Sequence, residues 1–175
     1  MSPVPSAYRI AVATPEHLPA LAGIERAATV LFPEEDVPLE LRWGTTDPGA
    51  LEAACNNGTL WVALDARGAA VGFACAEQQG SCAHLGEVDV LPEHGRQGLG
   101  ARLVQAVIQW AREAGLSAVT LTTFRHLPWN APFYARLGFL EVSPDELEDH
   151  LRAILERETD SGLDPAKRVA MALRC

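Results

Sequence analysis

The most chemically informative segment of this chain is a glycine-rich turn, Gly95-Arg96-Gln97-Gly98-Leu99-Gly100-Ala101, which comes directly before a helix-like stretch. Glycines let backbone N–H groups converge on a ligand without obstruction by Cβ atoms. The start of the helix adds further N–H groups and the positive end of the helix dipole. The segment therefore predicts an anion site, and a phosphate or pyrophosphate is its expected ligand.

Two common phosphate-binding motifs do not fit this turn. A nucleotide P-loop needs Gly-Lys-Ser/Thr, and the turn contains no lysine. The dinucleotide fingerprint GxGxxG also fails, because Leu103 stands where a third glycine would follow Gly98 and Gly100. The sequence therefore disfavours a nucleotide-binding α/β protein and favours a different phosphate-bearing ligand.

A strand and a long helix are expected to hold the turn in position. The strand covers residues 83–91 and stops at Pro92, after which the spacing of apolar residues changes to the period of a helix. Gly115 stands where a helix C-cap is expected. The opposite face of this helix is polar, so we expect it to pack on one side only. Its apolar face consists of Leu99, Leu103, Val104, Val107, Ile108 and Ala111.

The rest of the chain predicts an α/β fold. Asp65–Gly68, between two apolar runs, is typical of a hairpin loop. Further strands are expected over residues 8–12, 60–64, 70–75, 117–123 and 168–173, and further helices over residues 15–28, 48–54, 129–137 and 143–158. The last helix is expected to open with a capping box, Ser143-Pro144-Asp145-Glu146. We therefore predict a single domain with a mixed sheet over residues 1–175.

The composition limits the function classes. The net charge of −9 argues against nucleic acid or an anionic membrane as the main partner. No apolar run reaches the roughly 20 residues of a membrane helix, and residues 1–5 lack a signal-peptide pattern, so we expect a cytoplasmic protein. The cysteines lack the spacing of zinc ligands, so no metal is expected. The acidic run Glu34-Glu35-Asp36 is interpreted as a solvated loop, with attraction of a cationic substrate as the alternative.

Two segments in the right order resemble the GNAT superfamily of acetyltransferases. The superfamily signature, Arg/Gln-x-x-Gly-x-Gly/Ala, follows a strand that ends in Val-x-Pro, as the turn here follows Val90-Leu91-Pro92. Residues 129–139 (WNAPFYARLGF) resemble the superfamily's helix with a tyrosine shortly before Gly-Phe, and with Pro128 they are similar to a bacterial branch with a PWNAPFYxxLGF motif. The first signature position holds Gly95 instead of Arg or Gln, so we expect the phosphate site to depend on backbone donors.

The resemblance implies a mixed, mostly antiparallel sheet with splayed central parallel strands, flanked by helices, and it implies acetyl-CoA as the acetyl donor. The pantetheine arm would pair with the backbone of Val88, Asp89 and Val90, next to the strand over residues 117–123. Asn130 is expected either to touch the pantetheine or to cap the helix that follows it. The pyrophosphate would bind at Arg96, Gln97, Gly98, Leu99, Gly100 and Ala101.

The resemblance also assigns a general acid. Tyr134 matches the family's tyrosine, whose hydroxyl protonates the departing thiolate, and the alternative is a core tyrosine with a satisfied hydroxyl. For the general base we select Glu87, with Asp89 on the same face of the strand two residues on. A water relay from His84 or His126 is the alternative. The segment 121–123 lacks the carboxylate that some family members carry there.

The predicted function is transfer of the acetyl group of acetyl-CoA to a primary amine of a small molecule or peptide, by direct attack in a ternary complex. An alkyl ammonium has a pKa near ~10, so the reaction needs a base or a water relay at neutral pH. The alternative is a non-catalytic, regulatory module that binds acyl-CoA. The sequence does not identify the acceptor, and it leaves a monomer and a homodimer open.

Overall fold

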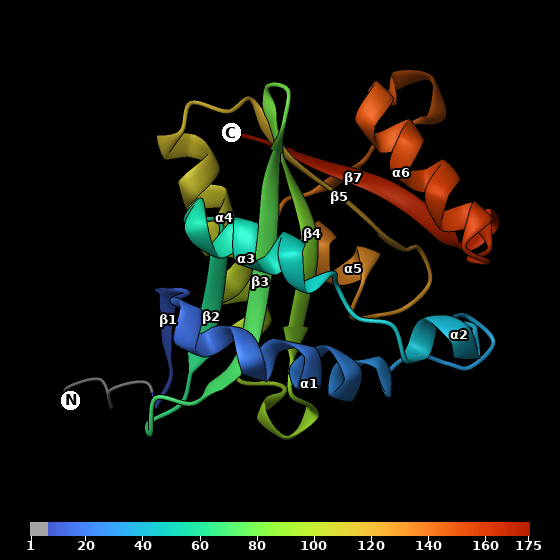
Figure 1. Cartoon of the computed structure of the whole chain (residues 1–175). Coiled ribbons are helices and arrows are strands. Elements are labelled where there is room, and N and C mark those ends of the chain that lie inside the picture. The colour runs from blue at the N-terminus through green and yellow to red at the C-terminus, as the bar shows by residue number, and fades with distance from the viewer. Residues whose placement is uncertain (1–6) are drawn as a thin grey trace. The chain divides into compact units, whose positions relative to one another are not determined.

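Figure 1 shows the computed structural model of the chain, which describes residues 7–175. Residues 1–5, considered above for a signal peptide, lie outside the described part. Within it, seven strands form one sheet in the order β1-β2-β3-β4-β5-β7-β6. The strands are β1 (Arg9–Val12), β2 (Leu60–Leu64), β3 (Ala70–Gln79), β4 (Cys82–Val90), β5 (Ala118–Phe124), β6 (Leu140–Glu141) and β7 (Arg168–Arg174).

Helices and short 3-10 turns connect the strands (Figure 1). The α-helices are α1 (Leu18–Thr29), α2 (Leu39–Arg42), α3 (Pro48–Asn56), α4 (Leu99–Glu113), α5 (Ala131–Arg136) and α6 (Asp149–Asp160). The 3-10 turns are η1 (Pro15–His17), η2 (Pro92–His94), η3 (Pro144–Glu146) and η4 (Pro165–Lys167). The pairs β1–β2, β2–β3, β5–β7 and β6–β7 are antiparallel and β4–β5 is parallel, which confirms the predicted mixed, mostly antiparallel sheet flanked by helices.

The described residues form two compact units. The N-terminal unit comprises the described residues up to Leu31, together with Thr45–Ala76 and Glu87–Val107, and the C-terminal unit comprises Phe32–Gly44, Glu77–Gly86 and Ile108–Cys175. In the N-terminal unit, β1 pairs with β2 and β2 pairs with β3, so these strands form a meander.

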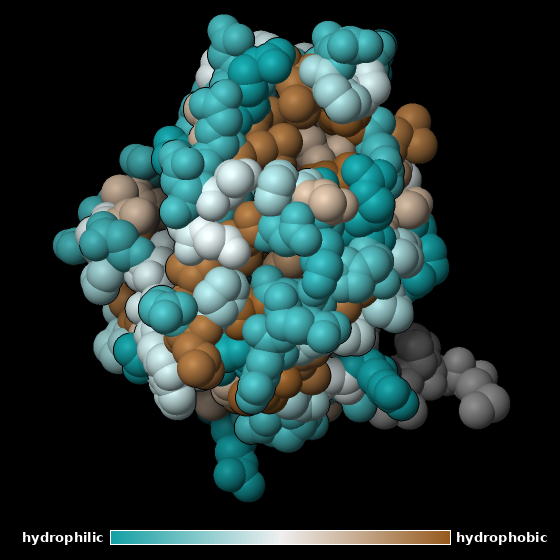
Figure 2. Space-filling model, turned by 90° about the vertical axis from the view of Figure 1, so that its right-hand side faces the viewer, coloured by the Kyte–Doolittle hydropathy of each residue, from teal (hydrophilic) through white to brown (hydrophobic). Residues whose placement is uncertain are grey.

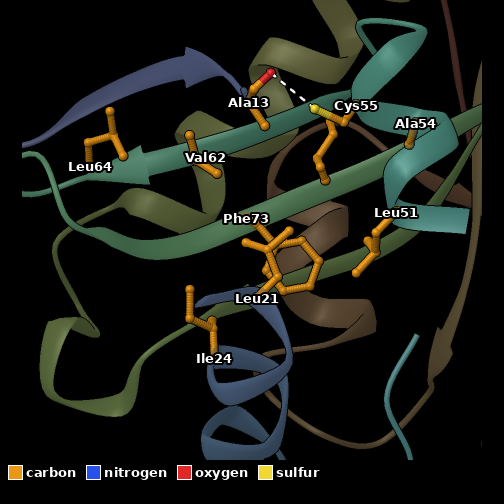
Figure 3. Packing of buried hydrophobic residues seen from close by; sticks show 10 residues of the cluster. Ala13, Leu21, Ile24, Leu51, Ala54, Cys55, Val62, Leu64 and Phe73 are labelled. Carbon is orange, nitrogen blue, oxygen red and sulfur yellow. Dashed lines mark hydrogen bonds between the residues drawn. The ribbon is translucent and has the colours of Figure 1, made fainter. Parts of the chain in front are cut away.

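The hydrophobic core of the N-terminal unit lies where α1 and α3 pack on β2 and β3 (Figure 3). Leu21 and Ile24 of α1 share one face of that helix, as their spacing predicts, and Leu51 comes from α3. Phe73 of β3 is completely buried among them. Burying each of these large side chains contributes about 1.5–3 kcal/mol, so the cluster fixes both helices on the sheet.

The C-terminal unit is built on the long antiparallel pair β5–β7. The register runs from Ala118 opposite Arg174 to Phe124 opposite Arg168, and β6 adds to the other edge of β7. The start of β4 pairs in parallel with the start of β5, and this ladder ends at His84 opposite Thr120. The parallel ladder is therefore much shorter than either of the strands that form it.

The structure corrects the predicted start of the last helix. Ser143 makes no capping hydrogen bond through its side chain, and Pro144–Glu146 forms a 3-10 turn instead of the first helical turn. Leu147 then has an extended backbone, with ψ at 119°, and α6 begins only at Asp149 with Glu148 as its N-cap. The predicted capping box at residues 143–146 is therefore wrong, because an extended residue separates it from the helix.

Helix α2 was not predicted, because it is a single turn without a buried face. Leu39 is 63% exposed and the following Trp43 is 74% exposed, so no apolar stripe marks the segment. The turn is held from its polar side: Nη2 of Arg42 donates a hydrogen bond of 2.6 Å to the carbonyl oxygen of Phe32. Arg42, at the end of α2, thus holds the loop that precedes this helix.

No helix among residues 7–175 combines the length and the apolar character needed to cross a bilayer. Figure 2 shows one face of the molecule, on which hydrophilic side chains predominate and hydrophobic ones form separate areas between them. A mixed surface of this kind is ordinary for a folded chain, because polar atoms alone cannot cover it.

A buried carboxylate joins three segments of the C-terminal unit. The side chain of Asp36 is only 1% exposed, and it accepts a bond of 2.6 Å from Nζ of Lys167. Its second oxygen lies 2.9 Å from Nε2 of His126. The interpretation of Glu34-Glu35-Asp36 as a solvated loop is therefore wrong for its last residue, which is an internal anchor. Lys167 above all holds the pKa of Asp36 below its usual value, with His126 contributing.

Replacing this anchor with a neutral isostere should lower stability. We expect Asp36→Asn to reduce the free energy of unfolding by about 1–3 kcal/mol at pH 7, because the amide cannot accept both charge-assisted bonds. Since the pKa of Asp36 is lowered on folding, its contribution is present above the ordinary value of 3.8 and is lost as pH falls through the folded-state pKa. Urea unfolding at pH 7 and in acid measures both effects; an equal difference at both pH values would contradict the assignment.

Candidate active site

Two residues of the glycine-rich turn have a left-handed backbone conformation directly before α4. Arg96 has φ at 59° and Gly98 has φ at 74°, whereas Gly95 has an ordinary φ of −64°. Residues 95–98 are exposed, and Leu99 at 2% exposure anchors the beginning of the helix. The glycine at position 98 is needed for its conformation, but the glycine at position 95 is not.

The first turn of α4 directs backbone donors toward this exposed turn. The N–H of Arg102 bonds to the carbonyl of Gly98 at 3.1 Å, which is the first i to i−4 bond. The N–H groups of Leu99, Gly100 and Ala101 come before it, so helix geometry gives them no carbonyl acceptor within the helix. These donors lie next to two residues with a left-handed backbone, and together they can bind an anion, as the sequence predicts.

Two contacts of Tyr8 hold the segment on either side of the turn. Its hydroxyl lies 2.9 Å from Nδ1 of His94 in η2, and the two rings meet edge to face. Its carbonyl oxygen accepts bonds of 3.3 Å from both terminal nitrogens of Arg102 in α4. The residue before β1 thus ties together the two ends of the turn.

Two predicted site residues, Glu87 and Asp89, lie on the same face of β4. They meet Glu25 of α1, and one carboxylate oxygen from each of the three lies within 4.8 Å of the others. We call these residues the carboxylate triad. A hydrogen bond joins the side chains of Glu87 and Asp89. Because a carboxylate can only accept, this bond requires a proton on one of the two groups.

Burial dominates the electrostatics of the triad. It raises the pKa of Asp89 to about 7, against a smaller lowering by the hydrogen bond from Glu87 and a further increase from the charge of Glu25. Burial also raises the pKa of Glu25, whose carboxylate accepts bonds of 2.9 and 3.0 Å from the N–H of Thr46. Burial therefore favours the protonated forms of Asp89 and Glu25 over their charged forms.

Glu25 is not among the site residues predicted from the sequence, although a signal was present. Glu25 lies four residues after Leu21 and three before Ala28, which are both buried on the core-facing side of α1. A carboxylate inside an apolar stripe is unusual, since such groups are rarely buried without a partner. The sequence did not reveal which residues it would meet, because Glu87 and Asp89 are far away along the chain.

The strand β3 approaches β4 closely at this point. A Cβ at Gly72 would lie 2.9 Å from the carbonyl oxygen of Asp89 and 3.1 Å from Cγ2 of Val90. The N–H of Leu91 donates to the carbonyl of Val71 at 2.8 Å. Gly72 is therefore required for this fit, and it sets the position of the backbone over Val88–Val90.

Asn130 and Tyr134 lie at the start and in the middle of α5. Asn130 occupies the N-cap position, but its side chain makes no capping bond, so the capping alternative is wrong. Its Oδ1 instead accepts bonds of 2.7 Å from Oγ1 of Thr123 and 3.3 Å from the N–H of Phe124. The half-buried Tyr134 packs edge to face against its neighbour Phe133, with ring centroids 5.0 Å apart.

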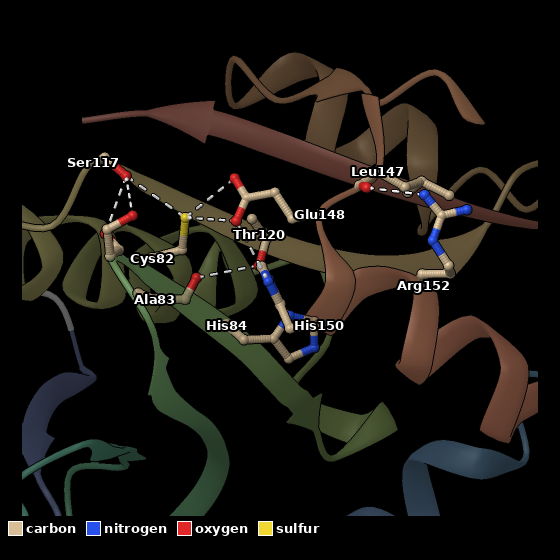
Figure 4. A network of polar contacts seen from close by, with 10 residues as sticks. Cys82, Ala83, His84, Ser117, Thr120, Leu147, Glu148, His150 and Arg152 are labelled. Atoms are coloured by element: carbon tan, nitrogen blue, oxygen red, sulfur yellow. Dashed lines mark hydrogen bonds and ion pairs between the residues drawn. The ribbon is translucent and has the colours of Figure 1, made fainter. Parts of the chain in front are cut away.

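The histidines considered for a water relay are both bound to other side chains. Nδ1 of His84 lies 3.0 Å from Oγ1 of Thr120, which also lies 3.1 Å from Nε2 of His150 (Figure 4). Burial lowers the pKa of His84 to about 4, so this imidazole is neutral at pH 7. His126 bonds to Asp36. Each histidine therefore has an observed partner within its own unit.

A carboxylate does reach the segment 121–123, but it comes from α6. Oγ1 of Thr122 donates a bond of 2.5 Å to Oε1 of Glu158. The same carboxylate forms an ion pair of 2.9 Å with Arg168, and both side chains are largely buried. The sequence could not place Glu158 there, because its contact depends on how α6 packs on β5.

A sequence model of the acetyltransferase (GNAT) family matches residues 23–139. The match covers more than half of the chain. The chain belongs to the GNAT acetyltransferase family. The GNAT match includes the turn, the triad and the segment that carries Asn130 and Tyr134, whereas Glu158 lies outside it.

Solved structures confirm the GNAT fold. An N-acetylglutamate synthase from Neisseria gonorrhoeae, complexed with coenzyme A and N-acetyl-glutamate, has a TM-score of 0.71 at 20% identity; the alignment covers 95% of this chain and only 35% of the synthase chain. The PaiA N-acetyltransferase from Thermoplasma acidophilum, in complex with coenzyme A, has a TM-score of 0.69 at 15% identity, with 96% and 99% covered. A GNAT-family acetyltransferase from Staphylococcus aureus has a TM-score of 0.71 at 16% identity, with 96% and 99% covered.

Proposed function

We propose that residues 1–175 act as one acetyl-CoA-dependent N-acetyltransferase domain that acetylates a primary amine. The observation that carries the proposal is the conformation of the turn within the GNAT match: two left-handed residues, Arg96 and Gly98, directly before the donors at the start of α4. This arrangement suits the pyrophosphate of coenzyme A, because backbone N–H groups and the helix dipole both favour an anion. The coenzyme complexes of the related GNAT structures support the same ligand.

Acetyl-CoA would supply an activated acetyl group on sulfur. The backbone N–H groups of Val88–Val90 are proposed to orient the thioester and polarise its carbonyl. Glu87 would accept a proton from the acceptor ammonium. The amine nitrogen then forms the new C–N bond as the C–S bond breaks, and it releases its second proton to solvent. Tyr134 would donate its hydroxyl proton to the departing sulfur and regain a proton from solvent.

The test is release of free thiol from acetyl-CoA with a panel of amines, together with calorimetric binding of coenzyme A to the full chain. Amine-dependent thiol release supports an N-acetyltransferase. Stoichiometric binding without release on any amine would favour the regulatory acyl-CoA-binding module. A chain that does not bind coenzyme A would contradict both functions.

The conformation of the turn also predicts how a substitution there changes the affinity for coenzyme A. We expect Gly98→Ala to weaken coenzyme A binding roughly tenfold, because a left-handed alanine costs about 1–2 kcal/mol and shifts the backbone donors. Gly80→Ala, at the β3–β4 turn, is the matched control: Gly80 also has a positive φ, of 60°, and a Cβ at either position meets nothing within 4 Å. Titration calorimetry should show weaker binding for Gly98→Ala alone; equal affinities in the two variants would contradict a phosphate site at the turn.

A further inference from the structure

Four polar side chains form a continuous path from the end of the β4–β5 ladder to the surface of the C-terminal unit (Figure 4). Nδ1 of His84 lies 3.0 Å from Oγ1 of Thr120, and the same oxygen lies 3.1 Å from Nε2 of His150. Nδ1 of His150 lies 3.5 Å from Oε2 of Glu148. His84 and Thr120 are 6% and 2% exposed, whereas the side chain of Glu148 is 58% exposed. We call these four residues the imidazole network.

Glu148 fixes the positions of the protons at the surface end of the network. A carboxylate only accepts hydrogen bonds, and both oxygens of Glu148 lie 3.8 Å from Sγ of Cys82, which donates to them. A lone pair on Nδ1 of His150 would be repelled by this carboxylate, so Nδ1 carries the proton. In the neutral ring of His150, Nε2 therefore has the lone pair, and it accepts the O–H of Thr120.

The same reasoning assigns the tautomer of His84. Thr120 has a single O–H, so once it donates to His150, Nδ1 of His84 must donate to the hydroxyl oxygen. The competing acceptor for this O–H is the carbonyl oxygen of Ala83, at 3.4 Å. Burial lowers the pKa of His84 to about 4, so the ring is neutral at pH 7 and its Nε2 carries a lone pair. Weaker effects on this pKa come from four nearby charged groups: His150, Glu77, Glu158 and Arg157.

We propose that the imidazole network is a proton relay that carries the second proton of the acceptor amine from the end of the β4–β5 ladder to solvent. This inference rests on the proposed N-acetyltransferase function, in which β4 continues from His84 to the residues that hold the thioester, Val88–Val90. A proton that reaches Nε2 of His84 releases the Nδ1 proton to Oγ1 of Thr120, whose own proton passes to Nε2 of His150. Only N–H and O–H bonds form and break. His84 ends as its other neutral tautomer, and His150 ends as an imidazolium beside the carboxylate of Glu148.

The relay explains how a buried ring with a low pKa can take part in proton transfer. Because the Nδ1 proton leaves as the new proton arrives, the positive charge never rests on His84, where burial disfavours it. The charge rests on His150, 3.5 Å from the carboxylate of Glu148. Nδ1 of His150 then releases its proton to solvent, and exchange with solvent at both ends restores the starting tautomers after the products leave.

Imidazole ¹⁵N NMR of the full chain tests the relay without any substrate. We expect His84 to be the Nδ1–H tautomer at pH 8 and to change to the Nε2–H tautomer, still uncharged, as His150 becomes protonated. In Thr120→Val, which removes the hydroxyl and keeps the shape, the tautomer of His84 should no longer follow the protonation of His150. A tautomer of His84 that stays fixed while His150 titrates in the wild type would overturn the inference, because the O–H of Thr120 then turns to the carbonyl of Ala83.

Thiol release at saturating amine measures the contribution of the relay to turnover. We expect Thr120→Val to lower kcat about tenfold to hundredfold with little change in KM for acetyl-CoA, and Thr120→Ser, which keeps the hydroxyl, to stay within a few-fold of the wild type. Thr122→Val is the matched control, because Thr122 lies on the same face of β5 and its hydroxyl bonds to Glu158, outside the network.

Each kinetic outcome separates the relay from the proposed function. Wild-type kcat in Thr120→Val, or an equal loss in Thr122→Val, would overturn the inference. Absence of thiol release by the wild type on any amine would contradict the proposed function, and the tautomer change of His84 then tests the relay alone.

Discussion

Replacing Tyr134 with phenylalanine should lower kcat about 10²–10⁴-fold while the affinity for acetyl-CoA changes little. The change removes only the hydroxyl, so the contacts of the ring with Phe133 and Phe139, at centroid distances of 5.0 and 5.7 Å, are retained. The effect is expected to fall on kcat because the sulfur receives its proton only as the C–S bond breaks. Steady-state thiol release and calorimetric coenzyme binding measure the two quantities.

The chain offers a matched control, because Tyr8 is its one other tyrosine. Tyr8→Phe makes the same chemical change but removes the bond to His94. We expect it to cost about 1 kcal/mol of stability and to leave kcat within a few-fold of the wild type. Similar kcat values for wild type and Tyr134→Phe would identify Tyr134 as a packing residue.

Replacing Asp89 with asparagine should stabilise the folded chain at alkaline pH. Burial raises the pKa of Asp89 from 3.8 to about 7, so between these values the folded state keeps a proton that the unfolded state has released. Stability therefore falls as pH rises through this range, and the loss is complete above about pH 7. Asparagine does not ionise, so we expect Asp89→Asn to be more stable by roughly 1–4 kcal/mol at pH 8.

Urea unfolding at pH 5 and pH 8 tests this expectation. The gain from Asp89→Asn should be smaller at pH 5, where the wild type still holds much of its proton. The control Glu52→Gln, which changes an exposed carboxylate on α3, should show no such change. A difference between Asp89→Asn and wild type that stays constant with pH would mean that Asp89 ionises normally. The stabilisation would show that the buried carboxylate of Asp89 is kept at the expense of stability.

Local patterns predicted most of the elements of the fold. The strand over residues 60–64 has the predicted bounds, because its apolar run is bordered by a turn with Gly68 in the left-handed conformation, at φ of 82°. The helix predicted before Gly115 ends at Glu113 for the same kind of reason. Short elements such as β6 were missed, since two exposed residues carry no period.

The site was predictable only where its residues are close in sequence. The turn over residues 95–101 could be interpreted as an anion site because helix geometry directs its donors. The triad could not be predicted, because Glu25 meets Glu87 and Asp89 only when α1 packs on the sheet. The contacts of Asn130 likewise depend on the end of β5, which no local pattern reveals.

The close fit of β3 against β4 restricts which residues this sequence can carry at position 72. Gly80 and Gly98 have open space around them, so substitution there brings backbone strain without a collision. At Gly72 even a methyl group would press on the backbone of Asp89, and no other rotamer relieves the contact because Cβ itself makes it. In a saturation library screened for folding and activity, position 72 should therefore accept glycine alone, and mutational tolerance would report the position of β4 independently of any charge.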